Sequence, residues 1–266
     1  MEVLWLAIVA VMISVYVVLD GFGLGAGVIS LFAARTADER QLVLRSIGPV
    51  WDGNEVWLLA GGGALFFAFP ALYAAGFSGF YLPLMIVLWL LILRGVSIEI
   101  RNEIASPLWT PFWDVIFGVS SALLAVFFGA ALGNVIRGVP LEPSGYFFLP
   151  LWTDFGFGPD GLGGDVGILD WYTILVGVTA LAALSVHGAR WVALKTPGDL
   201  EQRSLAFGNR LWWALAGLTL LTTAASFSIQ PRILENFARY PFGAVFPALA
   251  IAGLAGLWIY RDRGSE

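Results

Sequence analysis

The stretch from residue 48 to residue 70, GPVWDGNEVWLLAGGGALFFAFP, joins two kinds of chemistry that rarely occur side by side. Its second half contains only apolar and small residues, of the kind that a lipid bilayer accepts. Its first half places Asp52, Asn54 and Glu55 between two tryptophans, Trp51 and Trp57. Two acids at the start of an apolar helix need a physical reason. The composition of the chain limits which reasons apply.

The whole chain has the composition of a membrane protein. Of its 266 residues, 59% are hydrophobic and 12% are charged, and its mean hydropathy is +0.82. Soluble domains are typically about half apolar and about a quarter charged. The net charge of −5 comes without any basic stripe, so nucleic acid is not an expected partner. The absence of cysteine excludes disulfides, thiolate zinc sites and iron–sulfur clusters.

Seven segments are apolar enough to cross a bilayer, which requires about 20 apolar residues per helix. The sequence therefore predicts an all-α, polytopic membrane protein with about seven transmembrane helices. The first segment is longer than the hydrocarbon core, so its inner end should tilt or project. It begins without a basic stretch, which indicates a helix of the mature protein rather than a signal peptide. The predicted segments are 3–33, 55–72, 79–99, 113–135, 169–190, 211–229 and 242–260.

The basic residues predict how the helices are oriented, because Lys and Arg concentrate on the cytoplasmic side. Eleven of the 14 fall in loops or helix ends on one side of the predicted topology. The N-terminus is then expected outside and the C-terminus inside. We expect one membrane domain made of a first helical bundle (1–136), an outer loop (137–168) and a second bundle (169–266). The acids of the outer loop, Asp154, Asp160 and Asp165, are expected to be solvated.

Asp20 lies inside the first predicted span, in VVLDGFGLGAGV. A carboxylate at the centre of a transmembrane helix costs about 2.5–3.5 kcal/mol, so it normally faces protein or water. A proton relay or a partner contact is the favoured interpretation, and an acid that snorkels or bonds a neighbouring helix is the alternative. The glycines at 21, 23, 25 and 27 form two overlapping GxxxG spacings, which predict close approach of another helix. Gly61–Ala64 predicts close packing in the same way.

Asp52 and Glu55 are three residues apart and therefore share a helix face. In one interpretation Asp52 is an N-cap and Glu55 completes a capping box, because both acids suit the positive end of a helix dipole. In the other, both carboxylates line a wet notch that admits protons. The spacing alone leaves both interpretations open.

The third predicted span ends in ILRGVSIEIRNE. Arg94 and Glu99 lie within or at the edge of its apolar part. A guanidinium there can bind a carboxylate, such as a haem propionate or Asp52, or it can anchor the helix end. For Arg101 the anchor is the favoured interpretation. The only histidine, His187, is expected to be structural rather than a ligand, because one His and three Met allow few axial pairs.

Several motifs resemble subunit II of the cytochrome bd-type quinol oxidases. They are LDGFGLGAG in the first span, IGPVWDGNEVWLLAGGGALFFAFPALYAAGFSGFYLPL across the second and third, and RGVSIEIR after them. The match is most specific around WDGNEVW and GFYLPL, and a looser similarity extends over nearly the whole chain.

This resemblance implies a subunit of an electrogenic complex that oxidises quinol and reduces oxygen to water, and that is not catalytic alone. Haem b and haem d groups would be ligated by the partner, subunit I, against which this chain packs in the bacterial cytoplasmic (inner) membrane. Protons would enter along Asp52, Asp20 and Glu55. Arg94 would lie near the haem propionates, and Trp51, Asn54 and Glu99 would complete the subunit contact.

The resemblance also implies a structural quinone, membrane lipid and a small single-helix accessory subunit as further ligands or partners. Two departures from the family stand out: Gly23 replaces a second aspartate that many relatives carry, and the second bundle lacks two helices of the usual nine. A stand-alone proton-coupled transporter is the rival prediction, since intramembrane carboxylates also mark transport sites. A third possibility is a purely architectural scaffold.

Overall fold

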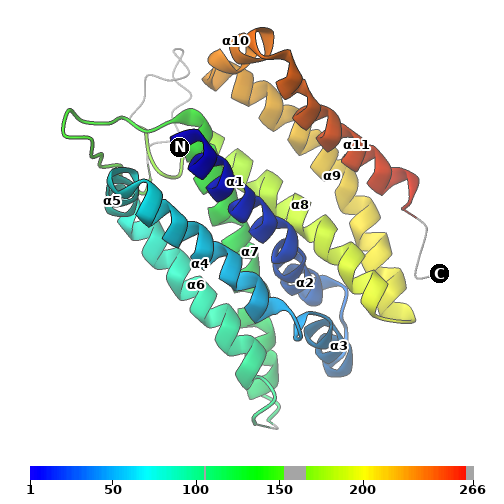
Figure 1. The fold of residues 1–266 in the computed structure, drawn as a ribbon. Coiled ribbons are helices and arrows are strands. Elements are labelled where there is room, and N and C mark those ends of the chain that lie inside the picture. Colours follow the sequence, from blue (N-terminus) through cyan, green and yellow to red (C-terminus); the bar gives the residue numbers. More distant parts are fainter. Residues whose placement is uncertain (105, 153–165, 262–266) are drawn as a thin grey trace.

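A computed structural model describes residues 1–104, 106–152 and 166–261, and Figure 1 shows their arrangement. The described chain is all-helical, as predicted, and its only β-type pairing is an isolated bridge between Trp152 and Leu169. The expectation for Asp154, Asp160 and Asp165 lies outside the described residues. The helices are α1 (Glu2–Leu19), α2 (Gly21–Phe32), α3 (Ala37–Ile47), α4 (Trp51–Ala68), α5 (Pro70–Gly79), α6 (Tyr81–Ile100), α7 (Trp109–Arg137), α8 (Trp171–Lys195), α9 (Asp199–Ile229), α10 (Arg232–Arg239), the 3₁₀ turn η1 (Pro241–Ala244) and α11 (Val245–Ile259).

Six helical segments of the described chain are long and apolar enough to cross a membrane, so the expected count of seven is not confirmed. The missing one is the second predicted segment, 55–72. Helix α4 begins at Trp51, which places three polar side chains in its first turns, and it ends at Ala68. Phe69 then leaves helical geometry (φ −138°, ψ 62°), and Pro70 starts α5. Polarity at one end and a proline-marked break at the other therefore shorten the apolar run.

The first predicted span is one candidate membrane segment, Glu2–Phe32, but it is divided at Asp20 into α1 and α2. Asp20 keeps a near-helical backbone (φ −92°, ψ −18°), and its carbonyl still accepts from the N–H of Leu24 at 2.9 Å. Helix α2 is the most buried helix of the described chain, because every residue from Gly21 to Ser30 is enclosed by neighbouring helices. The acid therefore sits where an exposed helix becomes a central one.

Glycines allow α2 to touch its neighbours at backbone distance, as the GxxxG spacings predict. A Cβ added to Gly25 would lie 1.9 Å from the carbonyl oxygen of Leu184 on α8. A Cβ on Gly27 would lie 2.2 Å from the Oγ of Ser121 on α7. The expectation for Gly61–Ala64 is only partly met: Gly61 packs against Ile13, whereas Gly62 and Gly63 have nothing within 4 Å of an added Cβ.

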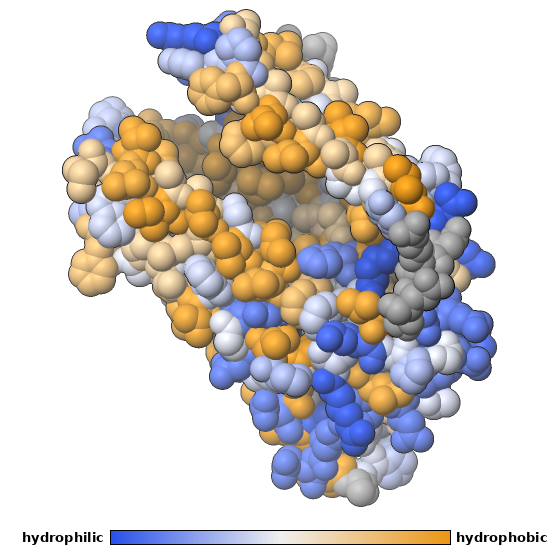
Figure 2. All heavy atoms as spheres, turned by 45° about the vertical axis from the view of Figure 1, so that its right-hand side comes forward, coloured by the Kyte–Doolittle hydropathy of each residue, from blue (hydrophilic) through white to orange (hydrophobic). Residues whose placement is uncertain are grey.

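The two predicted bundles share one core, because α2 of the first packs directly on α8 of the second (Figure 1). Helix α9 lies along α8, α10 and η1 follow at its C-terminal end, and α11 runs back beside α9 (Figure 1). No residue of α11 is buried. Figure 2 shows that this side of the molecule bears an extended apolar surface with a hollow in it. The proposed division at 136 and 168 stays a prediction.

The described part of the 137–168 loop packs on the end of the first bundle. Phe147 lies against Gly79, where an added Cβ would come within 2.3 Å of its ring. Its ring also meets that of Phe80 edge-on, with centroids 4.9 Å apart. Phe147 is buried with Leu149 and Ile168 in a small apolar cluster. The described part of the loop therefore covers part of this end of the molecule.

The basic residues of the inner loops gather at one end of the bundle. Arg203 donates to the carbonyl oxygen of Ala33 at 2.8 Å, and Arg101 donates to that of Ala37 at 3.3 Å. Figure 2 shows hydrophilic residues concentrated at its lower end, which is the end at which Figure 1 places α3. We call this end, which comprises α3, the C-terminal ends of α6 and α8 and the N-terminal ends of α4, α7 and α9, the basic end. Its assignment to the cytoplasm stays a prediction.

Candidate functional site: a buried arginine between two carboxylates

Arg94 on α6 binds two carboxylates that come from distant parts of the chain. Its Nη2 lies 2.7 Å from Asp20 Oδ1 and its Nη1 lies 3.3 Å from Asp20 Oδ2, which is a two-pronged contact. The same Nη1 donates to Glu55 Oε1 at 2.7 Å. Hydrogen bonds between ions are about twice as strong as neutral ones, and the planar guanidinium suits this geometry. We refer to these three residues as the Arg94 cluster.

Burial makes the Arg94 cluster energetically important. The side chains of Arg94 and Asp20 are fully buried, and that of Glu55 is 19% exposed. Removing charges from water costs several kcal/mol per ion, so such a group persists only when partners satisfy it. The Nε of Arg94 is buried without a hydrogen-bond partner. The cluster is therefore held by the two Nη atoms alone, and loss of either carboxylate leaves a buried cation short of a partner.

Each member of the cluster is positioned by its helix. Asp20 lies at the junction of α1 and α2, and Glu55 lies one turn inside α4. Asn54 ties these elements together, since its Nδ2 donates to the carbonyl oxygen of Leu19 at 2.7 Å. Trp51 lies against α6 near Arg94, because a Cβ added to Gly95 would be 3.4 Å from its ring. The WDGNE stretch thus holds α4 in contact with both α1 and α6.

Asp52 and Glu55 do not cap α4. The N-cap is Val50, and no side chain caps this end, so the capping interpretation of the two acids was wrong. Glu55 instead turns to Arg94, while Asp52 stays exposed. Arg94 accordingly pairs with Asp20 and Glu55, not with Asp52. The helical spacing places both acids on one side of α4, and the neighbouring helix decides which one is enclosed.

The remaining sequence candidates lie outside this cluster. Glu99 is exposed near the end of α6. His187 on α8 is half-buried against α2, where its ring meets Phe22 edge-on with centroids 5.9 Å apart. A haem propionate contact for Arg94 and a subunit contact for Glu99 stay predictions.

A second buried ionic group, which no sequence motif indicated, lies at the basic end. Asp114 at the start of α7 is 4% exposed and accepts from Arg101 at 2.5 Å and from Arg40 at 3.3 Å. Arg101 also donates to Gln41 Oε1 at 2.6 Å. Arg101 is therefore a buried clamp between α3, α6 and α7, not the interfacial anchor that was expected. The sequence signal for this ionic group was Asp114 itself, because an acid inside a predicted membrane span normally faces protein or water.

Glu39 on α3 forms a third ionic contact, outside the membrane-spanning segments. Its carboxylate accepts from the backbone N–H of Arg35 at 2.6 Å and pairs with Arg203 of α9. It also completes a capping box with Thr36. The Arg35 backbone hydrogen bond, helped by Arg203 and the Thr36 N–H, holds the pKa of Glu39 below its ordinary value of 4.5. Charge at this position thus stabilises the junction of α3 and α9.

We expect the stabilisation by Glu39 to disappear in acid. A carboxylate whose pKa is lowered by folding contributes its full stability above the ordinary value of 4.5 and loses it as pH falls through the lower folded value. The difference in melting temperature between the native chain and Glu39→Gln should therefore be constant near neutrality and shrink below about pH 4.5. Asp38→Asn, an exposed neighbour on the same helix, is the matched control. A pH-independent difference for Glu39→Gln would contradict the ionic assignment.

The described residues contain no group of three His, Cys, Asp or Glu side chains placed to hold a metal ion. The histidine and methionine side chains of this chain likewise do not fit the ligation of a haem iron. Its single histidine, His187, packs between Phe22 and the helix surface at Gly21, and the methionines belong to α1 and α6 or to the chain start. Among the described residues, no contact brings His187 to a methionine, so these donors do not form an axial pair for a haem.

The fold and the Arg94 cluster define a multi-pass helical membrane protein that encloses an ionic group between three helices. The model of the family described as cytochrome bd terminal oxidase subunit II matches residues 1–266. This chain belongs to that family.

Three curated relatives show the extent of the similarity. Cytochrome bd-I ubiquinol oxidase subunit 2 of Escherichia coli (strain K12) is 34% identical over 262 residues, which cover 96% of this chain and 65% of the relative. The probable cytochrome oxidase subunit 2 of Haemophilus influenzae is 35% identical, covering 93% and 70%. Cytochrome bd ubiquinol oxidase subunit 2 of Bacillus subtilis is 33% identical, covering 89% and 64%. The chain thus spans about two thirds of the length of these relatives.

Proposed function

We propose that this chain is the non-haem subunit II of a bd-type quinol:oxygen oxidoreductase in the bacterial cytoplasmic membrane. In this proposal it packs against a haem-bearing subunit I, stabilises it and supplies a proton entry route for the reduction of oxygen to water. The names of the relatives support the assembly, and the geometry of the Arg94 cluster supports the proton route. The rival, a stand-alone transporter, gains no support from the family.

The observation that carries the proton route is a gradient of exposure along three acids. Asp52 is exposed at the basic end, Glu55 is partly exposed one turn deeper, and Asp20 is fully buried. Groups that can accept and donate protons must line any path from water to buried chemistry. An ordered series from solvent to interior is what such a path requires.

The charge balance of the Arg94 cluster suits proton uptake. Two carboxylates face one guanidinium, so the cluster carries one excess negative charge when both acids are ionised. One proton neutralises it, and two carboxylates that share a site resist simultaneous ionisation. Asp20 holds Arg94 with both oxygens, whereas Glu55 holds it with one. Glu55 is therefore the member that exchanges a proton with Asp52 and water.

A lateral partner would find an apolar surface beside the cluster. Helices α4 and α6 expose large side chains, including Leu59 (74%), Phe67 (84%) and Trp89 (63%). Gly62 and Gly63 on α4 offer backbone that another helix can approach closely. These features support packing of subunit I along α4 and α6. The structural quinone and the single-helix accessory subunit stay expectations of the family resemblance, without a dedicated site among the contacts described above.

The proton route is tested by Asp52→Asn in the assembled complex. Groups that transfer protons contribute roughly 10²- to 10⁴-fold, and water can partly replace an exposed one, so we expect quinol-driven oxygen consumption to fall about tenfold. Proton uptake from the basic side should fall with it. The control is Asp199→Asn, an acid 87% exposed at the same end whose nearest cation is 3.9 Å away, and it should retain activity.

Two outcomes would refute parts of the proposal separately. If Asp52→Asn assembles and turns over like the native complex, the acids serve only the architecture. If the chain purifies alone and moves a solute without any haem-bearing partner, the assignment to an oxidase fails.

A further inference from the structure

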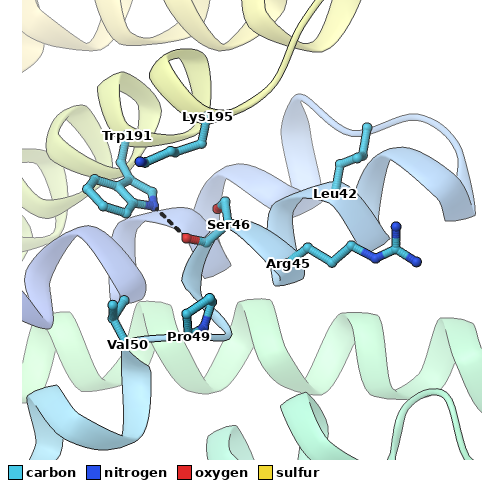
Figure 3. A pocket seen from close by; sticks show the side chains of 7 residues that line it. All are labelled: Leu42, Arg45, Ser46, Pro49, Val50, Trp191 and Lys195. Carbon is cyan, nitrogen blue, oxygen red and sulfur yellow. Dashed lines mark hydrogen bonds between the residues drawn. The ribbon is translucent and has the colours of Figure 1, made fainter.

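A pocket of about 340 Å³ opens at the basic end, away from the Arg94 cluster. It lies where the chain leaves α3 for α4 and where α8 ends (Figure 3). Arg45 and Ser46 line it from α3, Pro49 from the connecting turn, and Trp191 and Lys195 from α8. Nothing in the proposed oxidase function uses these residues.

The pocket combines two cations with no acid. Arg45 and Lys195 are both exposed, and no carboxylate is among the lining residues. In Figure 3 the Lys195 amine lies over Trp191 and the Arg45 side chain extends away from it, so the two cations lie on opposite sides of Ser46. Other basic residues at this end, such as Arg40, Arg101 and Arg203, are neutralised by acids. An anion entering this pocket would therefore meet charge that no described carboxylate offsets.

Trp191 forms one wall of the pocket and contacts two other helices. The indole N–H of Trp191 donates to the carbonyl oxygen of Ser46 at 3.2 Å, and its ring stacks on Phe22 with centroids 3.9 Å apart. The Nζ of Lys195 lies 5.1 Å from the centre of the same ring. Trp191 thus joins α3 to α8 and lies beside the Lys195 ammonium group.

The pocket also lies at the end of a candidate membrane span, where lipid headgroups are expected. Lys195 is the last residue of α8, which is one of the candidate membrane spans, and Trp191 lies one turn before it. Tryptophan concentrates at the membrane–water interface. Leu42 at the rim exposes 37% of its surface and gives an apolar edge next to the cations. A ligand with an anionic head and an apolar body fits this combination.

We propose that this pocket binds the phosphate group of an anionic phospholipid, with Arg45 and Lys195 as the charged contacts. Basic pockets between transmembrane helices are suited to such headgroups, and each Lys or Arg near an anionic membrane surface contributes about fivefold in affinity, equivalent to about 1 kcal/mol. The bound lipid bridges α3 and α8, which Trp191 already joins.

The test compares lipids on the purified, delipidated complex that contains the full chain. Phosphatidylglycerol, phosphatidylcholine and inorganic phosphate are added in turn, and bound lipid is counted by native mass spectrometry. We expect phosphatidylglycerol to bind more tightly than phosphatidylcholine, and Arg45→Ala/Lys195→Ala to weaken its binding roughly 5- to 25-fold. Arg210→Ala, an exposed arginine at the same end that does not line the pocket, should bind as the native protein does.

Three results would overturn the proposal. The first is equal binding of the two lipids, and the second is no effect of the double substitution in a complex whose melting temperature is unchanged. The third is displacement of the lipid by millimolar inorganic phosphate, which would assign the pocket to a soluble anion. The readout is lipid binding, so it is independent of whether the chain conducts protons.

Discussion

Replacement of Arg94 by Met is expected to destabilise the protein by about 3–5 kcal/mol, which is the usual cost of removing one partner from a buried ion pair. The substitution leaves Asp20 fully buried and without its guanidinium, beside a second carboxylate from Glu55. Because membrane complexes commonly unfold irreversibly, the measurement is the temperature at which half of the detergent-solubilised complex loses its native size. The yield of assembled complex should fall in parallel.

A double variant distinguishes a charge defect from a packing defect. Arg94→Met combined with Asp20→Asn removes both ions, so it should recover part of the lost stability, since replacing a whole buried pair is often nearly neutral. Arg94→Lys should be intermediate, because an ammonium cannot reproduce the two-pronged contact. If the double variant were no more stable than Arg94→Met, the ion pair would not be the reason that these residues matter.

Substitution of Gly25 by Ala is expected to have the second largest effect. The added Cβ would lie 1.9 Å from the carbonyl oxygen of Leu184 and 2.7 Å from the backbone nitrogen of Gly188. Backbone cannot move aside as a side chain can, so α2 and α8 must separate, at a cost of about 3 kcal/mol. The half-loss temperature of the complex should drop, and binding of subunit I should weaken with it.

The matched control is Gly217→Ala on α9. An added Cβ there meets nothing within 4 Å. Alanine favours helix over glycine by about 1 kcal/mol, so this variant should be neutral or slightly stabilised. Equal behaviour of Gly25→Ala and Gly217→Ala would mean that the close crossing of α2 and α8 does not contribute to stability.

Hydropathy predicted most of the fold, because the energetic cost of polar groups in lipid leaves long apolar runs as the main signal. The segments 79–99, 113–135 and 169–190 correspond to α6, α7 and α8. The span predicted at 55–72 is not confirmed, because the polar residues Asp52, Asn54 and Glu55 lower the hydropathy of α4, which ends at Ala68. Glu55 is held by its contact with Arg94 of α6, and its polarity lowers the mean hydropathy from which a membrane span is predicted.

The candidate site was predicted in its members but not in its pairing. The sequence singled out Asp20, Glu55 and Arg94, yet it offered Asp52 as a partner for the arginine. Which acid meets Arg94 depends on how α1, α4 and α6 pack, and no local pattern records that. Asp114 was missed because it lies among aromatic residues near a helix start, where an exposed acid is equally ordinary.

The Arg94 cluster also has a consequence for biogenesis. Asp20 and Arg94 are 74 residues apart in the chain, and Glu55 arrives on yet another segment. During translation the first hydrophobic segment must therefore enter the bilayer with a lone acid, which is released from this unfavourable state only when the segment carrying the arginine has been synthesised. The ionic cluster is therefore completed only after the segment that carries Arg94 has been synthesised.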